Sequence, residues 1–277
     1  ERSNPWSTVS PREEPKGRAK AVKELRRIML RKRIIPIVLL DGFSVLKTTK
    51  FQTRRNLGSP ITVARTYNTR NVDELVLLDI DASRQNRSID AFTIKDIAAE
   101  LFMPLTVGGG IRTVEDMRLA LVMGADKVAI NTEAISNPDL ITECSSVFGS
   151  QCVVASVDVQ CIEGSYAIYN NGRVIEGLEL VPWCRRLEAL GAGELLINGV
   201  DRDGTEKGAD IQLAKTVADA VRIPVIYAGG VCSTEDAASV AKTRVSGVGI
   251  SSIFHFTSIT PSECKAAMNA HGVPVRA

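Results

Sequence analysis

The chain repeats a glycine-rich segment at a spacing of 120 residues. Residues 106–116 read TVGGGIRTVED, and residues 227–236 read YAGGVCSTED. Each copy begins with a short apolar run, continues through glycines and ends where Thr113 or Ser233 is placed to cap a helix. Glycines let the backbone pass close to a ligand, and the N–H groups of a following helix start favour an anion. The repeat therefore predicts two phosphate-binding strand ends in one internally duplicated barrel.

A second pair of segments shares this spacing. Residues 74–81 read ELVLLDID, and residues 194–201 read ELLINGVD. A Gly-Gly pair alone suits an ordinary tight turn, but two matched pairs of segments at one offset make coincidence a poor explanation. A period of this length is typical of duplicated half-domains rather than of a solenoid.

The composition favours one large α/β domain. The chain has 277 residues, of which 44% are hydrophobic and 24% are charged, and this is enough to bury a substantial core. No apolar run approaches the roughly 20 residues that a membrane helix needs. The six cysteines include no Cys-x-x-Cys pair, so we expect reduced thiols in a cytoplasmic protein without a metal site or a membrane contact. No motif requires an organic cofactor.

The first 33 residues are strongly basic. They hold eleven Lys and Arg against four Asp and Glu, a charge of +7 in a chain whose net charge is +2. Such an arm suits nucleic acid or an acidic partner surface. Only 5% of the residues are aromatic, however, so we expect no nucleic-acid partner. Residues 1–28 are interpreted as a disordered or added leader ahead of Met29, and residues 29–277 as a single barrel domain.

From residue 33 onward, short β-branched runs alternate with helical stretches. This pattern predicts parallel strands joined by helices. The expected strands lie near 34–40, 74–80, 104–107, 127–130, 152–158, 194–198, 224–228 and 247–251, with helices such as 116–123, 138–148, 178–190, 211–220 and 235–242 between them. Eight strands in two similar halves favour a (β/α)8 TIM barrel over an open doubly wound sheet. In such a barrel the chemistry lies at the C-terminal ends of the strands.

Small and hydroxyl residues follow the expected strands in two clusters, one in each half. We predict that they bind two anionic groups on opposite sides of the barrel mouth, and tight turns are the alternative for the glycines. The first-half cluster is Gly109, Gly110, Asn131 and Thr132, and the second-half cluster is Asp203, Gly204, Gly229, Gly230, Ser251 and Ser252.

Two titratable residues at this rim are candidates for chemistry. Asp158 ends an apolar run, where its carboxylate would face the mouth as a general acid or base, or would only cap the next loop. Lys47 follows the first strand, on a loop that either closes over a phosphate or stays solvated.

Nearly the whole chain after residue 33 resembles the cyclase subunit of imidazole glycerol phosphate synthase, the ammonia-using barrel of histidine biosynthesis. The resemblance implies a synthase whose glutaminase partner docks at the N-terminal face of the barrel and sends ammonia through the core to the mouth. It also implies phosphate contacts at the two clusters above. The matching stretches are RII at 33–35, DELV at 73–76, LDI at 78–80, TVGGGI at 106–111, GADKV at 124–128, INT at 130–132, FGSQ at 148–151, DRDGT at 201–205, GG at 229–230 and FHF at 254–256.

The same resemblance implies an ammonia gate of four charged residues at the bottom of the barrel. They are Arg33, Glu74, Lys127 and Glu194. From the sequence alone, each is a strand-start residue that would cap a solvated barrel bottom, and two acids and two bases can satisfy one another in a closed ring.

The chain departs from the family at its first strand. The family uses two catalytic aspartates, and Asp158 matches the one that ends the fifth strand. The other position falls on Leu39 when counted from Arg33, or on Val38 when counted through the internal repeat. Neither is acidic, and Asp41 is the nearest candidate substitute. A cyclisation that needs an acid and a base on opposite sides of the new ring would lose one partner.

This departure brings the chain closer to a paralogous branch found with surface-polysaccharide genes, such as those of lipopolysaccharide. There a similar barrel and glutaminase are thought to supply ammonia that converts an acetamido sugar substituent into an acetamidino one. We therefore expect an ammonia-dependent subunit that pairs with a glutaminase and acts on a phosphorylated or nucleotide sugar. Two alternatives remain open: the histidine-pathway cyclase, with Asp41 as the second acid, and a non-catalytic barrel that binds and activates the glutaminase.

Overall fold

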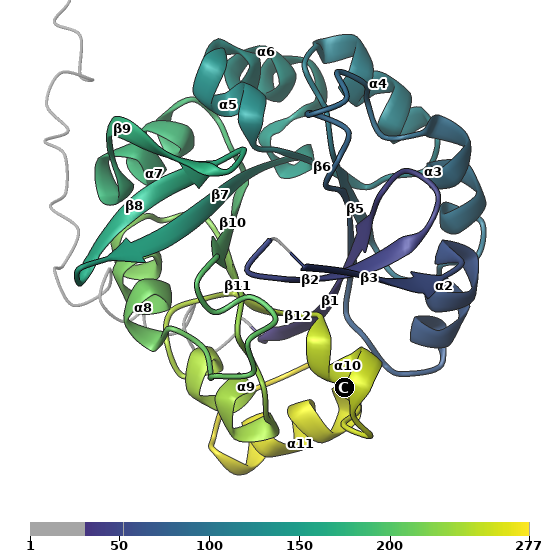
Figure 1. The fold of residues 1–277 in the computed structure, drawn as a ribbon, viewed down its shortest axis with the longest axis vertical. Helices are drawn as coiled ribbons and strands as arrows, with labels where there is room; N and C mark the ends of the chain where they lie inside the picture. Colours follow the sequence, from purple (N-terminus) through teal and green to yellow (C-terminus); the bar gives the residue numbers. More distant parts are fainter. Residues whose placement is uncertain (1–30, 52, 277) are drawn as a thin grey trace, which may run out of the picture.

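The computed structural model describes residues 31–51 and 53–276, so the interpretation of residues 1–28 as a leader lies outside the described residues. Eight parallel strands form a closed barrel (Figure 1). Strand β12 pairs with β1 and completes the circle, which confirms the predicted (β/α)8 TIM barrel. In hydrogen-bonding order the strands are β1 (Arg33–Leu40), β4 (Leu75–Asp79), β5 (Leu105–Gly108), β6 (Lys127–Ile130), β7 (Val153–Ile162), β10 (Glu194–Gly199), β11 (Val225–Ala228) and β12 (Gly247–Ile250).

Helices surround the barrel on the outside (Figure 1). The longer ones are α2 (Pro60–Asn68), α3 (Ala91–Ala98), α4 (Val114–Val122), α6 (Asp139–Phe148), α7 (Leu180–Ala189), α8 (Ile211–Ala220), α9 (Thr234–Ala241) and α11 (Pro261–Ala270). Two short helices, α5 (Thr132–Ser136) and α10 (Ser252–Phe256), and the 3-10 turn η1 (Ser150–Cys152) lie between them. Among the described residues, no helix has the length and apolar character needed to cross a bilayer.

Alternation along the strands divides the apolar residues between two cores. Side chains on the outer faces of the strands pack with the inner faces of the helices in one large buried cluster. Side chains on the inner faces form a second cluster inside the barrel, which comprises Ile35, Ile37, Val76, Ala129, Val154, Leu196, Ile226 and Ala228. The barrel is therefore a filled core whose chemistry is confined to its two ends.

Two β-hairpins extend the barrel and were not predicted from the sequence. β2 (Val45–Thr49) and β3 (Thr53–Gly58) follow β1, and β8 (Ser165–Asn170) and β9 (Arg173–Glu179) follow β7. The predicted end of the fifth strand at Asp158 is therefore wrong, because pairing with β8 continues β7 to Ile162. The helix expected over 178–190 begins only at Leu180, because the second hairpin strand, β9, continues to Glu179.

The internal duplication is visible in the elements. Strands β5 and β11 begin at Leu105 and Val225, and α4 and α9 begin at Val114 and Thr234, so each pair is 120 residues apart. The predicted caps are present: Thr113 Oγ1 accepts from Asp116 N at 3.1 Å, and Ser233 Oγ accepts from Asp236 N at 3.0 Å. The two halves therefore share their element order as well as their motifs.

Candidate active site at the barrel mouth

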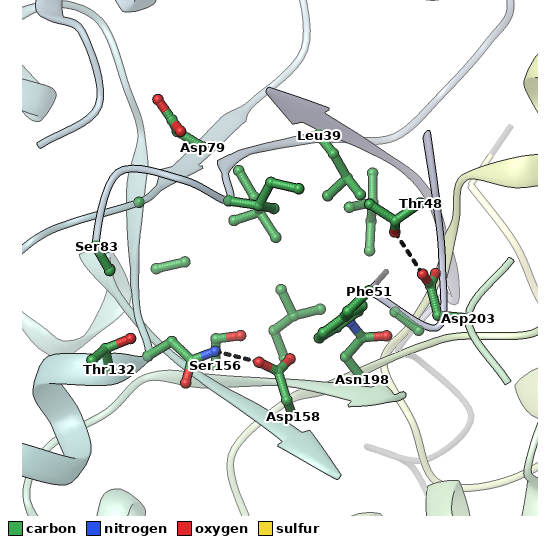
Figure 2. A pocket seen from close by; sticks show the side chains of 18 of the residues that line it. Leu39, Thr48, Phe51, Asp79, Ser83, Thr132, Ser156, Asp158, Asn198 and Asp203 are labelled. Carbon is green, nitrogen blue, oxygen red and sulfur yellow. Dashed lines mark hydrogen bonds between the residues drawn. The ribbon is translucent and has the colours of Figure 1, made fainter. Parts of the chain in front are cut away.

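A cavity of about 350 Å³ opens at the C-terminal ends of the strands (Figure 2). Residues of both predicted anion clusters line it, together with Asp158, but Gly204 of the second-half cluster does not, and neither do Lys47 and Asp41. The predicted residues that it brings together are Gly109, Gly110, Asn131, Thr132, Asp158, Asp203, Gly229, Gly230, Ser251 and Ser252. Residues from both halves of the chain thus meet at one site.

Asp158 points into this cavity from β7 and is half-buried (Figure 2). Asn131 Nδ2 donates to Asp158 Oδ2 at 2.8 Å, and Asn170 Nδ2 donates to Asn131 Oδ1 at 3.1 Å. Burial raises the pKa of Asp158 to about 6, although hydrogen bonds from Asn131 and Asn198 oppose the rise. A carboxylate with such a pKa is ionised at neutral pH but is a stronger base than an exposed one, so it suits proton transfer.

Leu39 occupies the position across the mouth from Asp158. Strands β1 and β7 lie on opposite sides of the barrel in the pairing order. Leu39 lines the cavity, whereas Val38 is 2% exposed and packs in the outer core. The register therefore decides between the two positions that counting allowed, and it assigns an apolar residue to this side of the mouth. Ile37 and Leu78 extend the apolar wall.

Asp41, the candidate second acid, lies in a turn outside the cavity. It follows β1 in the turn toward β2, and its Oδ1 accepts a hydrogen bond from the backbone N–H of Ser44 at 3.1 Å. This contact is that of an ordinary turn residue. Asp41 is absent from the lining of the cavity.

The glycines of the mouth are required by the close packing of neighbouring loops. A Cβ at Gly109 would lie 2.5 Å from the carbonyl oxygen of Asp79, and one at Gly229 would lie 2.6 Å from that of Gly199. Both glycines also have positive φ angles. The tight packing that the turn alternative implied is therefore present, and phosphate contact at these cavity-lining positions stays a prediction.

Asn131 and Ser251 show that the two halves offer equivalent positions to a ligand. Each lines the cavity and precedes a five-residue helix, with backbone angles of φ −119° and ψ −81° at Asn131 and φ −120° and ψ −70° at Ser251. Neither side chain caps its own helix. The two residues therefore line the mouth from opposite sides of the barrel.

The β2–β3 hairpin reaches over the mouth and contacts the loop after β10. Thr48 Oγ1 donates to Asp203 Oδ2 at 2.8 Å (Figure 2), and Lys50 N donates to Asp203 O at 2.9 Å. Burial raises the pKa of Asp203, against the hydrogen bond from Thr48 and the charge of Lys47. Lys47 also lies 3.8 Å from Glu206 of the same loop. Lys47 and Asp203 therefore help to hold the hairpin in place.

Phe51 comes from the tip of this hairpin and lines the cavity. Its ring meets the edge of Tyr169 from β8, with the ring centroids 6.4 Å apart. The hairpins of the two halves thus contact each other at the mouth of the barrel.

Several lining residues were missed by the sequence reasoning. Arg84 follows β4, Arg112 follows β5, and Asn198 lies on β10. Arg87, in the same loop as Arg84, donates to both carboxylate oxygens of Asp79, from Nη1 to Oδ2 at 2.5 Å and from Nη2 to Oδ1 at 3.1 Å. A signal was available for Arg84 and Arg112, because both lie in the loops that follow expected strands. Within the described ranges, no group of three His, Cys, Asp or Glu is placed to hold a metal ion.

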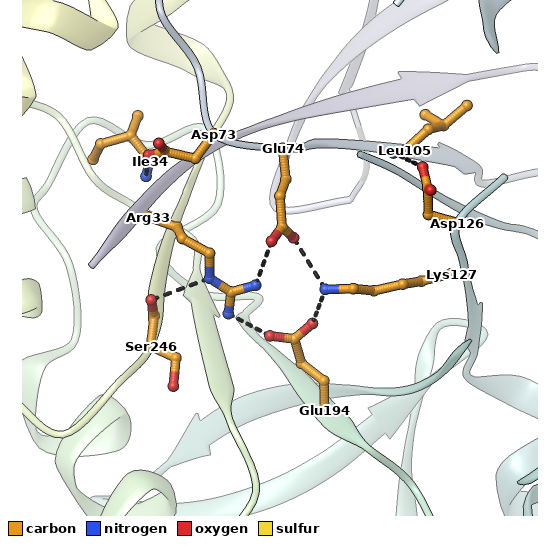
Figure 3. A network of polar contacts seen from close by, with 9 residues as sticks. All are labelled: Arg33, Ile34, Asp73, Glu74, Leu105, Asp126, Lys127, Glu194 and Ser246. Carbon is orange, nitrogen blue, oxygen red and sulfur yellow. Dashed lines mark hydrogen bonds and ion pairs between the residues drawn. The ribbon is translucent and has the colours of Figure 1, made fainter. Parts of the chain in front are cut away.

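The four predicted gate residues form a closed ring at the N-terminal end of the barrel (Figure 3). Arg33 contacts Glu74 at 2.6 Å and also Glu194, while Lys127 contacts Glu74 at 3.2 Å and Glu194 at 2.8 Å. Burial alone would lower the pKa of Arg33, but the two carboxylates outweigh it and hold this pKa above its ordinary value. The charges therefore alternate and satisfy one another, with the apolar inner core between this ring and the mouth.

Comparison with known families identifies the chain. Residues 33–260 match a family model described as histidine biosynthesis protein. The match covers all eight barrel strands, the mouth cavity and the charged ring. The chain therefore belongs to the histidine biosynthesis protein family.

Proposed function

We propose that the chain is the ammonia-using synthase subunit of a glutamine-dependent enzyme, related to the cyclase branch of its family. We further propose that its acceptor is an acetamido sugar, carried on phosphate or a nucleotide and converted to an acetamidino sugar for a surface polysaccharide. The observation that carries the proposal is the pair of facing strand ends at the mouth: the carboxylate of Asp158 on β7 faces the apolar side chain of Leu39 on β1. This arrangement suits a reaction with one proton acceptor beside a methyl group.

The chemistry needs only one base at the reacting carbon. Ammonia adds to the carbon of an acetamido group whose oxygen has first been phosphorylated by a nucleoside triphosphate. The bond from this carbon to oxygen then breaks, phosphate leaves, and the new nitrogen loses a proton. Asp158, with a pKa of about 6, is suited to accept that proton. Leu39 and Leu78 would contact the methyl group, because both line the same cavity. A cyclisation would instead require a second acid where Leu39 stands.

The proposed ammonia route begins at the opposite end of the barrel. The ring of Arg33, Glu74, Lys127 and Glu194 closes this end, so passage would require at least one of its contacts to open. Large apolar side chains are exposed where helices lead into the strand starts: Phe102 is 94% exposed, Val122 74% and Val147 51%. Exposed apolar groups of this kind favour a protein partner, and a glutaminase docked here would release ammonia at the ring.

The test is ammonia-dependent turnover by the purified chain. The substrate would be the thioacetamido analogue of a nucleotide-linked acetamido sugar, because its sulfur leaves as sulfide without prior activation. With 15N-labelled ammonium, mass spectrometry should find the label in an acetamidino product. Asp158→Asn should lower the rate by about 100-fold or more, which is the usual contribution of a general base.

Two other outcomes would replace this proposal. Steady formation of an imidazole from the histidine-pathway bisphosphate, lost in both Asp158→Asn and Asp41→Asn, would establish the cyclase. Stimulation of a glutaminase without any product from the barrel would establish a non-catalytic activator.

A further inference from the structure

The charges that line the mouth are unevenly divided between the two halves. Among the described residues that line the cavity, the basic ones are Arg84 and Arg112, and both belong to the first half. The second half contributes the carboxylates of Asp158 and Asp203 and, within the described residues, no basic group, and the first half contributes the carboxylate of Glu133. The charge of Asp79, which also lies on the first-half side, is matched by its contacts with Arg87.

The two arginines keep their charges available to a ligand. With the described residues, Arg84 makes no hydrogen bond or ion pair, and its side chain is exposed at the rim. Arg112 donates from Nη1 to the neutral amide oxygen of Asn86. A guanidinium presents several donors in a fixed plane and binds phosphate oxygens in pairs, so two unneutralised guanidiniums at one rim favour a ligand with more than one phosphate.

We propose that the first-half rim binds the diphosphate of a nucleoside-diphosphate sugar through Arg84 and Arg112. The sugar then lies inward, toward Asp158; this placement of the sugar rests on the proposed function. The charged group of the substrate then lies at the first-half end of the site, and the substrate is a nucleotide sugar rather than a sugar monophosphate.

Glu133 supports a nucleotide over a simple anion. It lines the cavity beside Thr132, on the same side as the two arginines. A carboxylate disfavours a bare phosphate next to it but accepts hydrogen bonds from hydroxyls, and the ribose of a nucleotide presents hydroxyls directly beside its phosphates. The first-half rim thus matches both parts of a nucleoside diphosphate.

The second half is less suited to the diphosphate. Asp203 lines the cavity, where its carboxylate accepts a hydrogen bond from Thr48, and a diphosphate placed there would meet a like charge. The neutral hydroxyls of Ser251 and Ser252 remain for the polar groups of the sugar.

Calorimetric titration tests this assignment without ammonia or a partner. Uridine diphosphate should bind the full chain at least about tenfold more tightly than uridine monophosphate, since it adds charge-assisted hydrogen bonds. Arg84→Ala and Arg112→Ala should each weaken the binding of the diphosphate by about tenfold or more and reduce this preference. The matched control is Arg118→Ala on the outer face of α4, where Arg118 pairs with Glu115 at 3.1 Å, and it should leave both affinities unchanged.

A mirrored pair of variants tests which half is used. Thr132 and Ser252 begin α5 and α10 and are 120 residues apart. Thr132→Asp should abolish binding of uridine diphosphate, whereas Ser252→Asp should change it less than threefold. Melting curves would check that both variants are folded. Equal affinity for the monophosphate and the diphosphate, or an equal loss in both aspartate variants, would overturn the inference. Diphosphate binding without ammonia transfer would refute only the proposed function.

Discussion

Replacing Arg33 by Met gives the sharpest test of the ring at the barrel bottom. Arg33 bridges Glu74 and Glu194, and each of these carboxylate side chains is only 5% exposed. Without the guanidinium, two buried negative charges would share the single ammonium of Lys127. Removing one partner from a buried ionic group costs about 3–5 kcal/mol, because the remaining charge stays buried without compensation. We expect a loss of this size in the free energy of unfolding.

The assay is urea unfolding at pH 7.5, followed by circular dichroism. Arg65→Met is the matched control, since Arg65 forms a comparable two-contact pair with Glu100 but its side chain is 64% exposed. This control should change the stability far less. The double variant Arg33→Met/Glu194→Gln should recover part of the loss. If Arg33→Met destabilises the protein no more than the control, the ring is solvated and the reasoning fails.

The pH dependence of this stability has a defined sign. Burial alone would raise the pKa of Glu194, but Arg33 and Lys127 outweigh it, and the folded-state pKa lies below the ordinary value of 4.5. Such a carboxylate stabilises the fold at pH values above its unfolded pKa, and this contribution is lost as the pH falls through the lower folded pKa. The wild-type chain should therefore lose stability on acidification below about pH 4.5, and Arg33→Met should lose less over the same range.

Three further predictions concern the mouth. Turnover should fall as the pH drops through about 6, the pKa of Asp158, because the ionised base is required, and a pH–rate profile of the wild type measures this. Leu39→Asp would place a like charge across the mouth, so the same profile should move to higher pH and imidazole formation from the histidine-pathway bisphosphate should appear; an unchanged profile would contradict the facing geometry. Gly204→Ala would put a Cβ 2.2 Å from Thr48 O at a φ of +64°, so trypsin should cleave the hairpin faster than in Gly172→Ala, which has a positive φ but no neighbour within 4 Å. Equal cleavage rates would show that the hairpin does not depend on this contact.

The barrel strands were predictable because their sequences are short apolar runs between clear helices. β6 begins and ends where it was expected, at Lys127 and Ile130. The hairpins were not predictable in the same way. β2 and β3 read VLKTT and TRRNLG, in which Val45 and Leu46 of β2 give the main apolar signal. β2 pairs with the end of β1, and β3 pairs in turn with β2, so the hairpin depends on an edge that the local sequence does not show.

The residue types of the candidate site were predictable from the sequence, but which side chains point into the cavity was not. The strand-end glycines were found from the repeat, and Asn131 was found from its place after an expected strand. The choice between Val38 and Leu39, however, depended on a one-residue register that only the pairing of β1 with its neighbours fixes. The pairing of Asp79 with Arg87, eight residues apart, likewise depends on the path of a loop that no local pattern specifies.

The two halves of the barrel have the same order of strands and α-helices but differ in the side chain that each places at the mouth. Asp158 and Leu39 face each other from corresponding first strands, yet both strands keep their neighbours and their hairpins. The second half therefore has an ionisable side chain, Asp158, at the position where the first half has the hydrocarbon side chain of Leu39. The strands and hairpins around the two positions are the same. A barrel built in this way can change its reaction by altering one of two symmetry-related positions, because neither half needs that side chain in order to fold.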